Sequence, residues 1–231
     1  MNENLPLYDD AGINLADPND HSGRKTKYIS LLQTMALRSI LKKTSGVAVD
    51  VGCGYGRMSK ALLSLGYDSV IGVDPSERVL RSASKLNPDI DFVTGSLPDL
   101  PFDSGAIDAI FLLNVLRALH LMGKLDIASG AAAPLKKGGQ LVVLDNIRRG
   151  HDKYIEEEKI ISMFEKNADL HLVSRTAIRG ARWPWIYMIQ FGLIPEKWYG
   201  QLAQWELDFM RNRKSAPVRQ YYNVVWVFEK A

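Results

Sequence analysis

Three glycines and a carboxylate, closely spaced along one stretch of the chain, are the residues best suited to bind a ligand. Gly52, Gly54 and Gly56 alternate with other residues directly after the apolar run at 47–51. Glycine lets the backbone adopt positive φ angles and approach a ligand to contact distance. Asp50 precedes the first glycine by two residues, so we expect its carboxylate at the end of a strand, facing a positively charged group. The pattern therefore predicts a cofactor site at this loop.

The glycine spacing distinguishes between two kinds of nucleoside cofactor. A dinucleotide fingerprint, Gly-x-Gly-x-x-Gly or Ala, needs a small third residue so that the following helix can pack on the strand. Arg57 occupies that position here, which disfavours NAD(P) and leaves a nicotinamide-dependent oxidoreductase as an alternative. Cys53 is interpreted as a small residue in the same tight loop, because no metal-ligand spacing surrounds it.

A second carboxylate, Asp74, ends the apolar run at 69–74. An acid at the end of a second strand can accept hydrogen bonds from both hydroxyls of a ribose. Pro75 follows, and proline is common at the first position of a helix, so a simple helix cap is the competing interpretation. We favour ligand binding, because strand, glycine loop and acid occur at the expected separation.

The elements that must position these residues are alternating strands and helices. Short apolar runs rich in Val, Ile and Leu, separated by helical spacing and by turn residues, are typical of an α/β domain. The expected strands are 47–51, 69–74, 90–94, 107–113, 140–145, 170–177 and 222–228, and the expected helices include 24–43, 58–65, 152–167 and one that closes at 131–139.

In this order the segments resemble class I S-adenosylmethionine-dependent methyltransferases. The resemblance rests on Asp-x-Gly-x-Gly-x-Gly at 50–56, Gly-Ser-Leu-Pro-Asp-Leu-Pro-Phe at 95–102 and Leu-Lys-Lys-Gly-Gly at 135–139. It implies a Rossmann-like, doubly wound sheet of seven mostly parallel strands, with an antiparallel last strand and helices on both faces. It also implies S-adenosylmethionine as cofactor, whose ammonium and sulfonium suit an acidic loop.

The resemblance also implies particular contacts. In the small-molecule group of the family the Leu-Pro-Phe segment lines the adenine pocket. Ser96 stands where that group has an acid, so the contact falls to its hydroxyl or to the main chain near Leu97. Asn114 is followed by Val115 and not by proline, which argues against methylation of nucleobase amines, and it either faces the active-site mouth or satisfies the strand end. The implied cofactor set is Asp50, Gly52, Cys53, Gly54, Gly56, Asp74, Pro75, Ser96, Leu97 and Asn114.

The amino-terminal region, 1–43, is interpreted as a polar arm followed by the helix at 24–43. In the family such a helix lies over the cofactor, which makes Arg24, Lys25 and Tyr28 candidates for its carboxylate end. A solvated basic face is the competing interpretation.

The reaction that the resemblance implies is attack of an acceptor atom on the sulfonium methyl, driven by positioning and exclusion of water. A hydroxyl acceptor would benefit from a general base. His151 is the first candidate, because it follows the fifth strand and histidine titrates near neutral pH. His120, Asp145 and a merely solvated loop histidine remain alternatives. The candidate catalytic residues are His151, Asp145 and Asn114.

Residues 178–220 separate the last two strands, a length that predicts a substrate lid. Trp183, Trp185 and Tyr187 crowd its first part and suggest a pocket for a bulky apolar acceptor, a dimer contact or a surface that rests on a membrane. A helix from Glu196 carries an apolar stripe that we expect to pack on its own domain. That stripe is Trp198, Leu202, Trp205 and Phe209, and the arginines available to an anionic acceptor group are Arg148, Arg149, Arg175, Arg179 and Arg182.

Composition limits the alternatives. A chain of 231 residues with 46% hydrophobic residues suits one domain. A net charge of +3 without basic runs does not predict nucleic-acid binding. The single cysteine excludes an internal disulfide, and the absence of a signal peptide and of about 20 consecutive apolar residues favours a cytoplasmic protein. We expect a methyltransferase acting on a sugar, lipid-linked or secondary-metabolite hydroxyl or amine, and keep a non-catalytic partner protein as an alternative.

Overall fold

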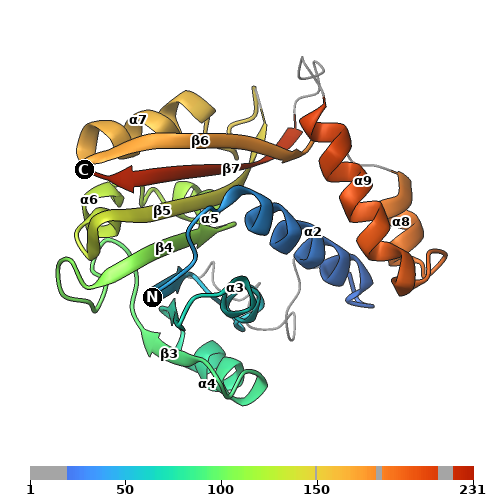
Figure 1. Cartoon of the computed structure of the whole chain (residues 1–231), viewed down its shortest axis with the longest axis horizontal. Helices are drawn as coiled ribbons and strands as arrows, with labels where there is room; N and C mark the ends of the chain where they lie inside the picture. The colour runs from blue at the N-terminus through green and yellow to red at the C-terminus, as the bar shows by residue number, and fades with distance from the viewer. Residues whose placement is uncertain (1–19, 149, 181–183, 213–220) are drawn as a thin grey trace.

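The computed structural model describes residues 20–148, 150–180, 184–212 and 221–231. Its centre is a seven-stranded sheet in the order β3-β2-β1-β4-β5-β7-β6 (Figure 1). Six strands are parallel, and β7 runs antiparallel between β5 and β6, so the predicted fold class is confirmed. The strands are β1 (Val47–Val51), β2 (Ser69–Asp74), β3 (Asp91–Thr94), β4 (Ile107–Leu113), β5 (Leu135–Arg148), β6 (Leu170–Arg179) and β7 (Tyr221–Lys230).

Strand order reverses between β1 and β4, which pair directly. In open α/β sheets the connections diverge at such a switch point, and ligands bind outside the carboxyl ends of the strands there. The glycine loop follows β1, so the fold places it at this edge.

Helices cover both faces of the sheet, which explains why its central strands are apolar at most positions. On one face α2 (Arg24–Ile40), α3 (Ser59–Leu65), α8 (Pro184–Gln190) and α9 (Tyr199–Arg211) pack around strand residues such as Phe111 and Val142. On the other face α5 (Leu116–Leu121), α6 (Ala128–Ala132) and α7 (Glu157–Asn167) pack around residues such as Ile110 and Trp226. Helix α4 (Glu77–Leu86) lies beside β2 and β3.

The insertion before β7 packs directly on the amino-terminal helix. Helices α8 and α9, joined through the 3₁₀ turn η1 (Glu196–Trp198), lie beside α2 (Figure 1). The Tyr28 ring meets the Tyr199 ring edge to face at 5.8 Å between centroids, and both side chains are buried. Segments far apart in the sequence therefore form one helical layer. Within the described parts of the chain, no helix combines the length and apolar character needed to cross a membrane.

The buried face of α9 differs from the predicted stripe. Tyr199, Ala203, Glu206 and Leu207 are buried, whereas Trp205 is 48% exposed. The prediction holds for Leu202, which is half-buried and packs against the core on this side of the sheet. It was wrong for Trp198 and Trp205, because α9 meets α2 and β6 through a face that carries the buried Glu206 carboxylate. Trp205 instead stacks on Phe209 and meets Trp185 edge to face.

Several element boundaries also differ from expectation. The Leu-Lys-Lys-Gly-Gly step does not end a helix, because α6 ends at Ala132 and β5 already begins at Leu135, with an irregular pairing to β4. Helix α7 begins at Glu157 and not at Asp152, since the preceding Ile155 is buried in the core and Tyr154 is held under the Arg117 guanidinium. Helix α2 ends at Ile40.

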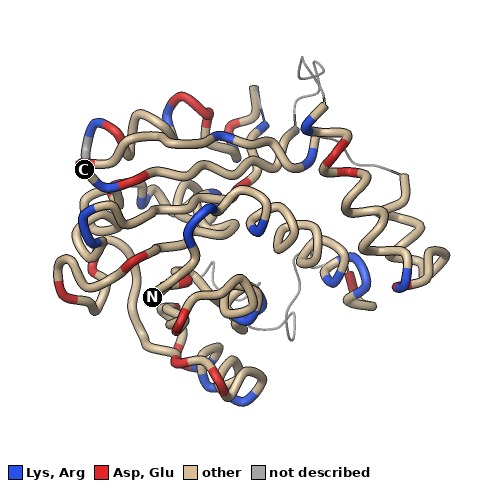
Figure 2. Tube along the Cα trace, in the orientation of Figure 1, with Lys and Arg blue, Asp and Glu red and all other residues tan. Residues whose placement is uncertain are grey.

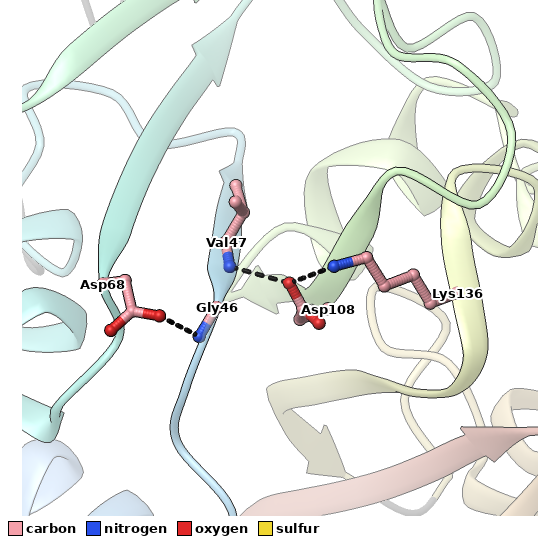
Figure 3. Close-up of polar contacts among 5 residues, drawn as sticks. All are labelled: Gly46, Val47, Asp68, Asp108 and Lys136. Carbon is pink, nitrogen blue, oxygen red and sulfur yellow. Dashed lines mark hydrogen bonds and ion pairs between the residues drawn. The ribbon is translucent and has the colours of Figure 1, made fainter.

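The amino end of β1 is held by two carboxylates (Figure 3). Asp108 accepts hydrogen bonds from the Val47 amide at 2.9 Å and from Lys136 Nζ at 2.8 Å, while Asp68 accepts from the Gly46 amide at 2.8 Å. Partial burial opposes ionisation of Asp108, but these hydrogen bonds hold its pKa below the usual range. This cluster joins β1 to β4 and β5 at the end of the sheet opposite the glycine loop.

Candidate cofactor site and active-site edge

The glycine loop turns sharply at the carboxyl end of β1. Gly52, Gly54 and Gly56 have φ angles of 72°, 55° and 77°, a region that residues with a β-carbon rarely adopt. The amides of Gly52 and Cys53 both donate to the Val73 carbonyl, at 2.7 and 3.0 Å, which ties the loop to β2.

The three glycines are needed for different reasons. A β-carbon on Gly52 would lie 2.7 Å from Val115, and one on Gly56 would lie 2.8 Å from Phe92, so these positions are restricted by the protein itself. Nothing lies within 4 Å of a β-carbon built on Gly54. Of the three, Gly54 is thus the position where the backbone faces open space, as a cofactor site requires.

Asp74 is held at the edge of this loop by main-chain amides. Its Oδ2 accepts from the Gly54 amide at 3.0 Å, and its Oδ1 accepts from the Ser76 amide at 3.0 Å. The residue is partly exposed. The competing interpretation, with Pro75 as first helical residue, is wrong, because Ser76 is the N-cap of α4 and its Oγ accepts from the Val79 amide. Asp74 is therefore oriented by the glycine loop and does not serve as the helix cap.

Asp50 is buried behind the loop and not displayed on it. It is 2% exposed, and its Oδ2 accepts from Ser59 Oγ at 2.6 Å. Burial raises the pKa of Asp50 to about 6, although the Ser59 hydrogen bond and the positive charge of Arg57 oppose that rise. The sequence predicted that Asp50 would face a positively charged group. In the structure Arg57 supplies a positive charge near this carboxylate.

Arg57, which the sequence marked only as a departure from the dinucleotide pattern, connects the loop to α2. Its Nη1 donates to Ser30 Oγ at 2.8 Å and to Gln33 Oε1 at 3.2 Å. Burial lowers the pKa of the Arg57 guanidinium, and the Asp50 carboxylate opposes that shift. Polar residues spaced along one side of the predicted helix, at 30 and 33, were the only signal for this contact.

The loop after β3 lies next to Asp74. The Gly95 amide donates to the Asp74 carbonyl at 3.2 Å, so the loops after β1, β2 and β3 are joined by hydrogen bonds. Ser96 is exposed on this segment, whereas the Leu97 side chain is 5% exposed and packs in the core. The structure therefore brings the predicted adenine segment to the same edge as the glycine loop.

Asn114 follows β4 at the switch point and has an unusual backbone. Its φ angle is 64°, and its amide donates to the Leu144 carbonyl at 2.7 Å. Among residues with a side chain, asparagine tolerates this left-handed conformation best. The chain therefore turns sharply at Asn114, directly after the strand, and this turn directs Val115 against Gly52.

Asp145 has a structural role at the end of β5. It is 2% exposed and accepts from the Asn146 amide at 2.6 Å and the Arg117 amide at 3.3 Å. Burial raises the pKa of Asp145 to about 6, although the hydrogen bonds from these amides oppose that rise. The enclosed carboxylate anchors α5 to the strand through these amides, and its role as a general base stays a prediction.

The two candidate histidines approach the same residue. His151 Nδ1 lies 3.3 Å from Asp152 Oδ1, and His120 Nε2 lies 2.8 Å from the Asp152 carbonyl oxygen. His151 also meets the Tyr154 ring edge to face. The loop after β5 thus gathers both histidines on one side of the sheet edge.

Three residues predicted to contact ligands are used internally. The Tyr28 hydroxyl is buried and donates to Glu206 Oε2 at 2.8 Å, so it is not available to a cofactor carboxylate. Arg179, 9% exposed, pairs with Glu206 Oε1 at 3.1 Å. Arg175 forms a two-pronged pair with Glu157 at 2.7 and 2.9 Å. These contacts join α2 and β6 to α9, and β6 to α7, so the charges of both arginines are paired within the protein.

The remaining acceptor-side predictions lie on separate elements. Arg148 ends β5 and is half-buried, whereas Trp185 and Tyr187 lie on α8, where Tyr187 is 45% exposed. Arg149, Arg182 and Trp183 fall outside the described residues. Among the residues that are described, no cluster of His, Cys, Asp or Glu has the makings of a metal site.

Comparisons with known proteins bear on this arrangement. Residues 48–139 match a family model described as a methyltransferase domain. The chain is 28% identical to the ubiquinone/menaquinone biosynthesis C-methyltransferase of Campylobacter jejuni over 161 residues, which cover 67% of this chain and 65% of that protein. It is 31% identical to the tRNA U34 carboxymethyltransferase of Pseudomonas savastanoi over 122 residues, which cover 50% of this chain and 38% of that protein. The chain thus spans less than two thirds of the length of these curated relatives.

A solved structure is similar over more of the chain. The geranyl diphosphate C-methyltransferase of Streptomyces coelicolor A3(2), determined with Mg²⁺, geranyl diphosphate and S-adenosyl-L-homocysteine, aligns with a TM-score of 0.63. Its sequence is 17% identical, and the alignment covers 94% of this chain and 85% of that one. At this identity the similarity concerns the fold.

Proposed function

We propose that this chain, which belongs to the class I S-adenosylmethionine-dependent methyltransferases, binds S-adenosylmethionine and transfers its methyl group to a small-molecule acceptor. One observation carries the proposal. Asp74 is fixed by the Gly54 amide at the carboxyl edge of the sheet, where Gly54 itself faces open space. An oriented acid beside an open, glycine-lined backbone fits a ribose and its attached sulfonium side chain.

The residues present fit this cofactor better than a dinucleotide. The antiparallel β7 and the partly buried Arg57, in place of a small third residue, both depart from the dinucleotide-binding pattern. The cofactor, when bound, supplies an electrophilic methyl group. In the proposed site Asp74 accepts from the ribose hydroxyls, and the Ser96 hydroxyl or the main chain near Leu97 contacts the adenine. Helix α2, held to the loop through Arg57, shields the site from water.

The acceptor in this proposal is apolar or ring-containing. Two of the similar proteins are named for ubiquinone/menaquinone biosynthesis and for geranyl diphosphate, and α8 contributes Trp185 and Tyr187 to the helical layer beside α2. The similarity to a protein named for tRNA U34 makes tRNA the competing acceptor class. For a hydroxyl acceptor, His151 is the proposed general base, with His120 as its neighbour.

Binding is tested first, by calorimetry with S-adenosylmethionine, S-adenosylhomocysteine, NAD and NADP. We expect saturable binding of the first two only. Tight binding of NAD without binding of S-adenosylmethionine would overturn the proposal and restore the oxidoreductase alternative.

Transfer is tested separately with S-adenosylmethionine carrying a labelled methyl group in a cell extract. Label recovered in the organic or small-molecule fraction supports the proposed acceptor class. Label recovered in tRNA would replace it with a nucleic acid. Cofactor binding without any transfer would favour a non-catalytic partner protein.

The general base is tested with the acceptor that this assay identifies. His151→Ala should lower turnover by about 10²–10⁴-fold if His151 removes a proton in the reaction. His171→Ala, an exposed histidine on β6, is the matched control and should leave turnover unchanged.

A further inference from the structure

The turn between α8 and η1 exposes an unusual amount of apolar surface. Phe191 is 74% exposed and Leu193 69% exposed, the two highest values among the large hydrophobic residues that the structure describes. Trp198, at the end of η1, is 50% exposed. Large exposed apolar patches on a folded protein typically mark sites that bind another protein, a ligand or a membrane. We call Phe191, Leu193 and Trp198, with the basic residues described next, the tip surface.

Basic side chains border these apolar residues. Arg24 and Lys27 are exposed at the start of α2, and Lys197 is exposed on η1. Figure 2 shows Lys and Arg residues, coloured blue, at the end of α2 that lies beside α8 and α9. A β-carbon on Gly192 would lie 3.3 Å from Arg24 Cζ, Lys27 forms an ion pair with Glu196, and Ser22 Oγ donates to the Gln190 carbonyl at 3.3 Å. The apolar turn and the basic helix start are therefore one continuous surface.

Hydrogen bonds and packing hold the turn in this shape. The Gly192 amide donates to the Ile189 carbonyl at 2.9 Å, and the Leu193 amide donates to the Met188 carbonyl at 2.8 Å. This pair of bonds, with Gly192 at a φ of 73°, is a Schellman motif that ends α8. Ile186 and Ile189 are buried beneath it. Phe191 and Leu193 are thus presented outward on a fixed helix end.

We propose that the tip surface binds a membrane that contains anionic lipids. Exposed Trp, Phe and Leu residues bordered by Lys and Arg suit the headgroup region of a bilayer, where apolar side chains enter the boundary and cations meet lipid phosphates. Charge favours this occupant over a second copy of the chain. A symmetric dimer through the tip surface would gather two copies of Arg24 and Lys197 in one interface.

The test uses the full chain with vesicles of phosphatidylcholine alone or mixed with phosphatidylglycerol, and measures co-sedimentation. We expect binding to the mixed vesicles and little binding to phosphatidylcholine. The double variant Phe191→Ser/Leu193→Ser should bind about tenfold more weakly or worse, and Lys197→Glu should weaken binding to the anionic vesicles only. Val173→Ser, which removes a 53% exposed apolar residue from β6, is the matched control and should bind like the wild type.

Three results would overturn the proposal. The first is failure of the wild type to bind the mixed vesicles, and the second is equal binding by the double variant. The third is a concentration-dependent dimer, seen by sedimentation velocity, that the double variant abolishes while vesicle binding is absent, since the tip surface would then serve self-association. Because all three variants change exposed side chains, circular dichroism should show unchanged folding. None of these readouts depends on the proposed methyl transfer.

Discussion

Gly52 and Val115 face each other across the switch point of the sheet, so closely that a β-carbon on Gly52 would lie 2.7 Å from Val115 Cγ2. Val115 is a β-branched residue with restricted rotamers, and Asn114 before it has a φ of 64°. The turn after β4 is thereby fitted against the turn after β1. The two loops that border the candidate site are therefore shaped by each other.

This relationship separates the roles of two glycines. Gly52→Ala should cost about 2–5 kcal/mol of unfolding free energy, the sum of a left-handed alanine and a steric conflict with Val115. Gly54→Ala should cost only about 1–2 kcal/mol, because its β-carbon meets no protein atom, yet it should weaken S-adenosylmethionine binding. Urea unfolding and calorimetry measure the two effects. Equal destabilisation with unchanged cofactor affinity in Gly54→Ala would contradict the assignment.

Asp74 should dominate cofactor affinity. Asp74→Ala should weaken S-adenosylmethionine binding by about 10- to 100-fold, because hydrogen bonds to a charged group contribute about 1.5–3 kcal/mol each. Asp91→Asn, an exposed carboxylate at the opposite end of β3, is the control and should bind normally. Calorimetry with S-adenosylhomocysteine gives the same comparison without turnover. Matching affinities for Asp74→Ala and Asp91→Asn would remove Asp74 from the site.

The buried carboxylate of Glu206 should be the most sensitive link between α2, α9 and β6. Glu206→Gln should destabilise the protein by about 3–5 kcal/mol, because it leaves Arg179 buried without its counter-charge. Tyr28→Phe should cost about 1.5–3 kcal/mol through loss of one hydrogen bond to a charged group. Glu196→Gln, which breaks the exposed pair with Lys27, should cost less than about 1 kcal/mol. Chemical denaturation that ranks Glu196→Gln above Glu206→Gln would refute this account.

Asp50 should make the folded protein less stable as pH rises from about 4 to 6. Its folded pKa, raised by burial to about 6, lies above the unfolded value of 3.8, so in this window the folded state holds a proton that the unfolded state has lost. Ionising Asp50 in the folded state therefore costs up to about 3 kcal/mol by pH 7.

The measurement compares unfolding free energies of wild type and Asp50→Asn at pH 4 and pH 7. The asparagine amide of this variant cannot ionise, so the variant should gain stability relative to the wild type between these pH values. The difference between the two proteins cancels the other carboxylates, including Asp108, whose pKa is lowered and whose contribution has the opposite sign. A constant difference across the window would show that Asp50 titrates normally.

Local patterning was sufficient for the framework of this fold. The strands at 69–74 and 107–113 have the predicted bounds, and β7 is antiparallel as the family resemblance implied. Such runs can be recognised in the sequence because a strand buried on both faces is apolar at nearly every position. The glycine loop and Asp74 could be predicted because a positive φ favours glycine, and because binding of ribose hydroxyls at a strand end requires an acid.

The partners of buried polar groups were decided only by tertiary structure. A glutamate in a helix is ordinarily expected to face solvent. Glu206 instead contacts Tyr28, 178 positions away in the chain, and Arg179 at the end of β6. The same holds for Arg57, whose partners lie on α2. Periodicity indicates which faces are apolar, but a charged residue can be buried wherever an opposite charge from another element meets it. That pairing depends on how the helices pack, which no local pattern records.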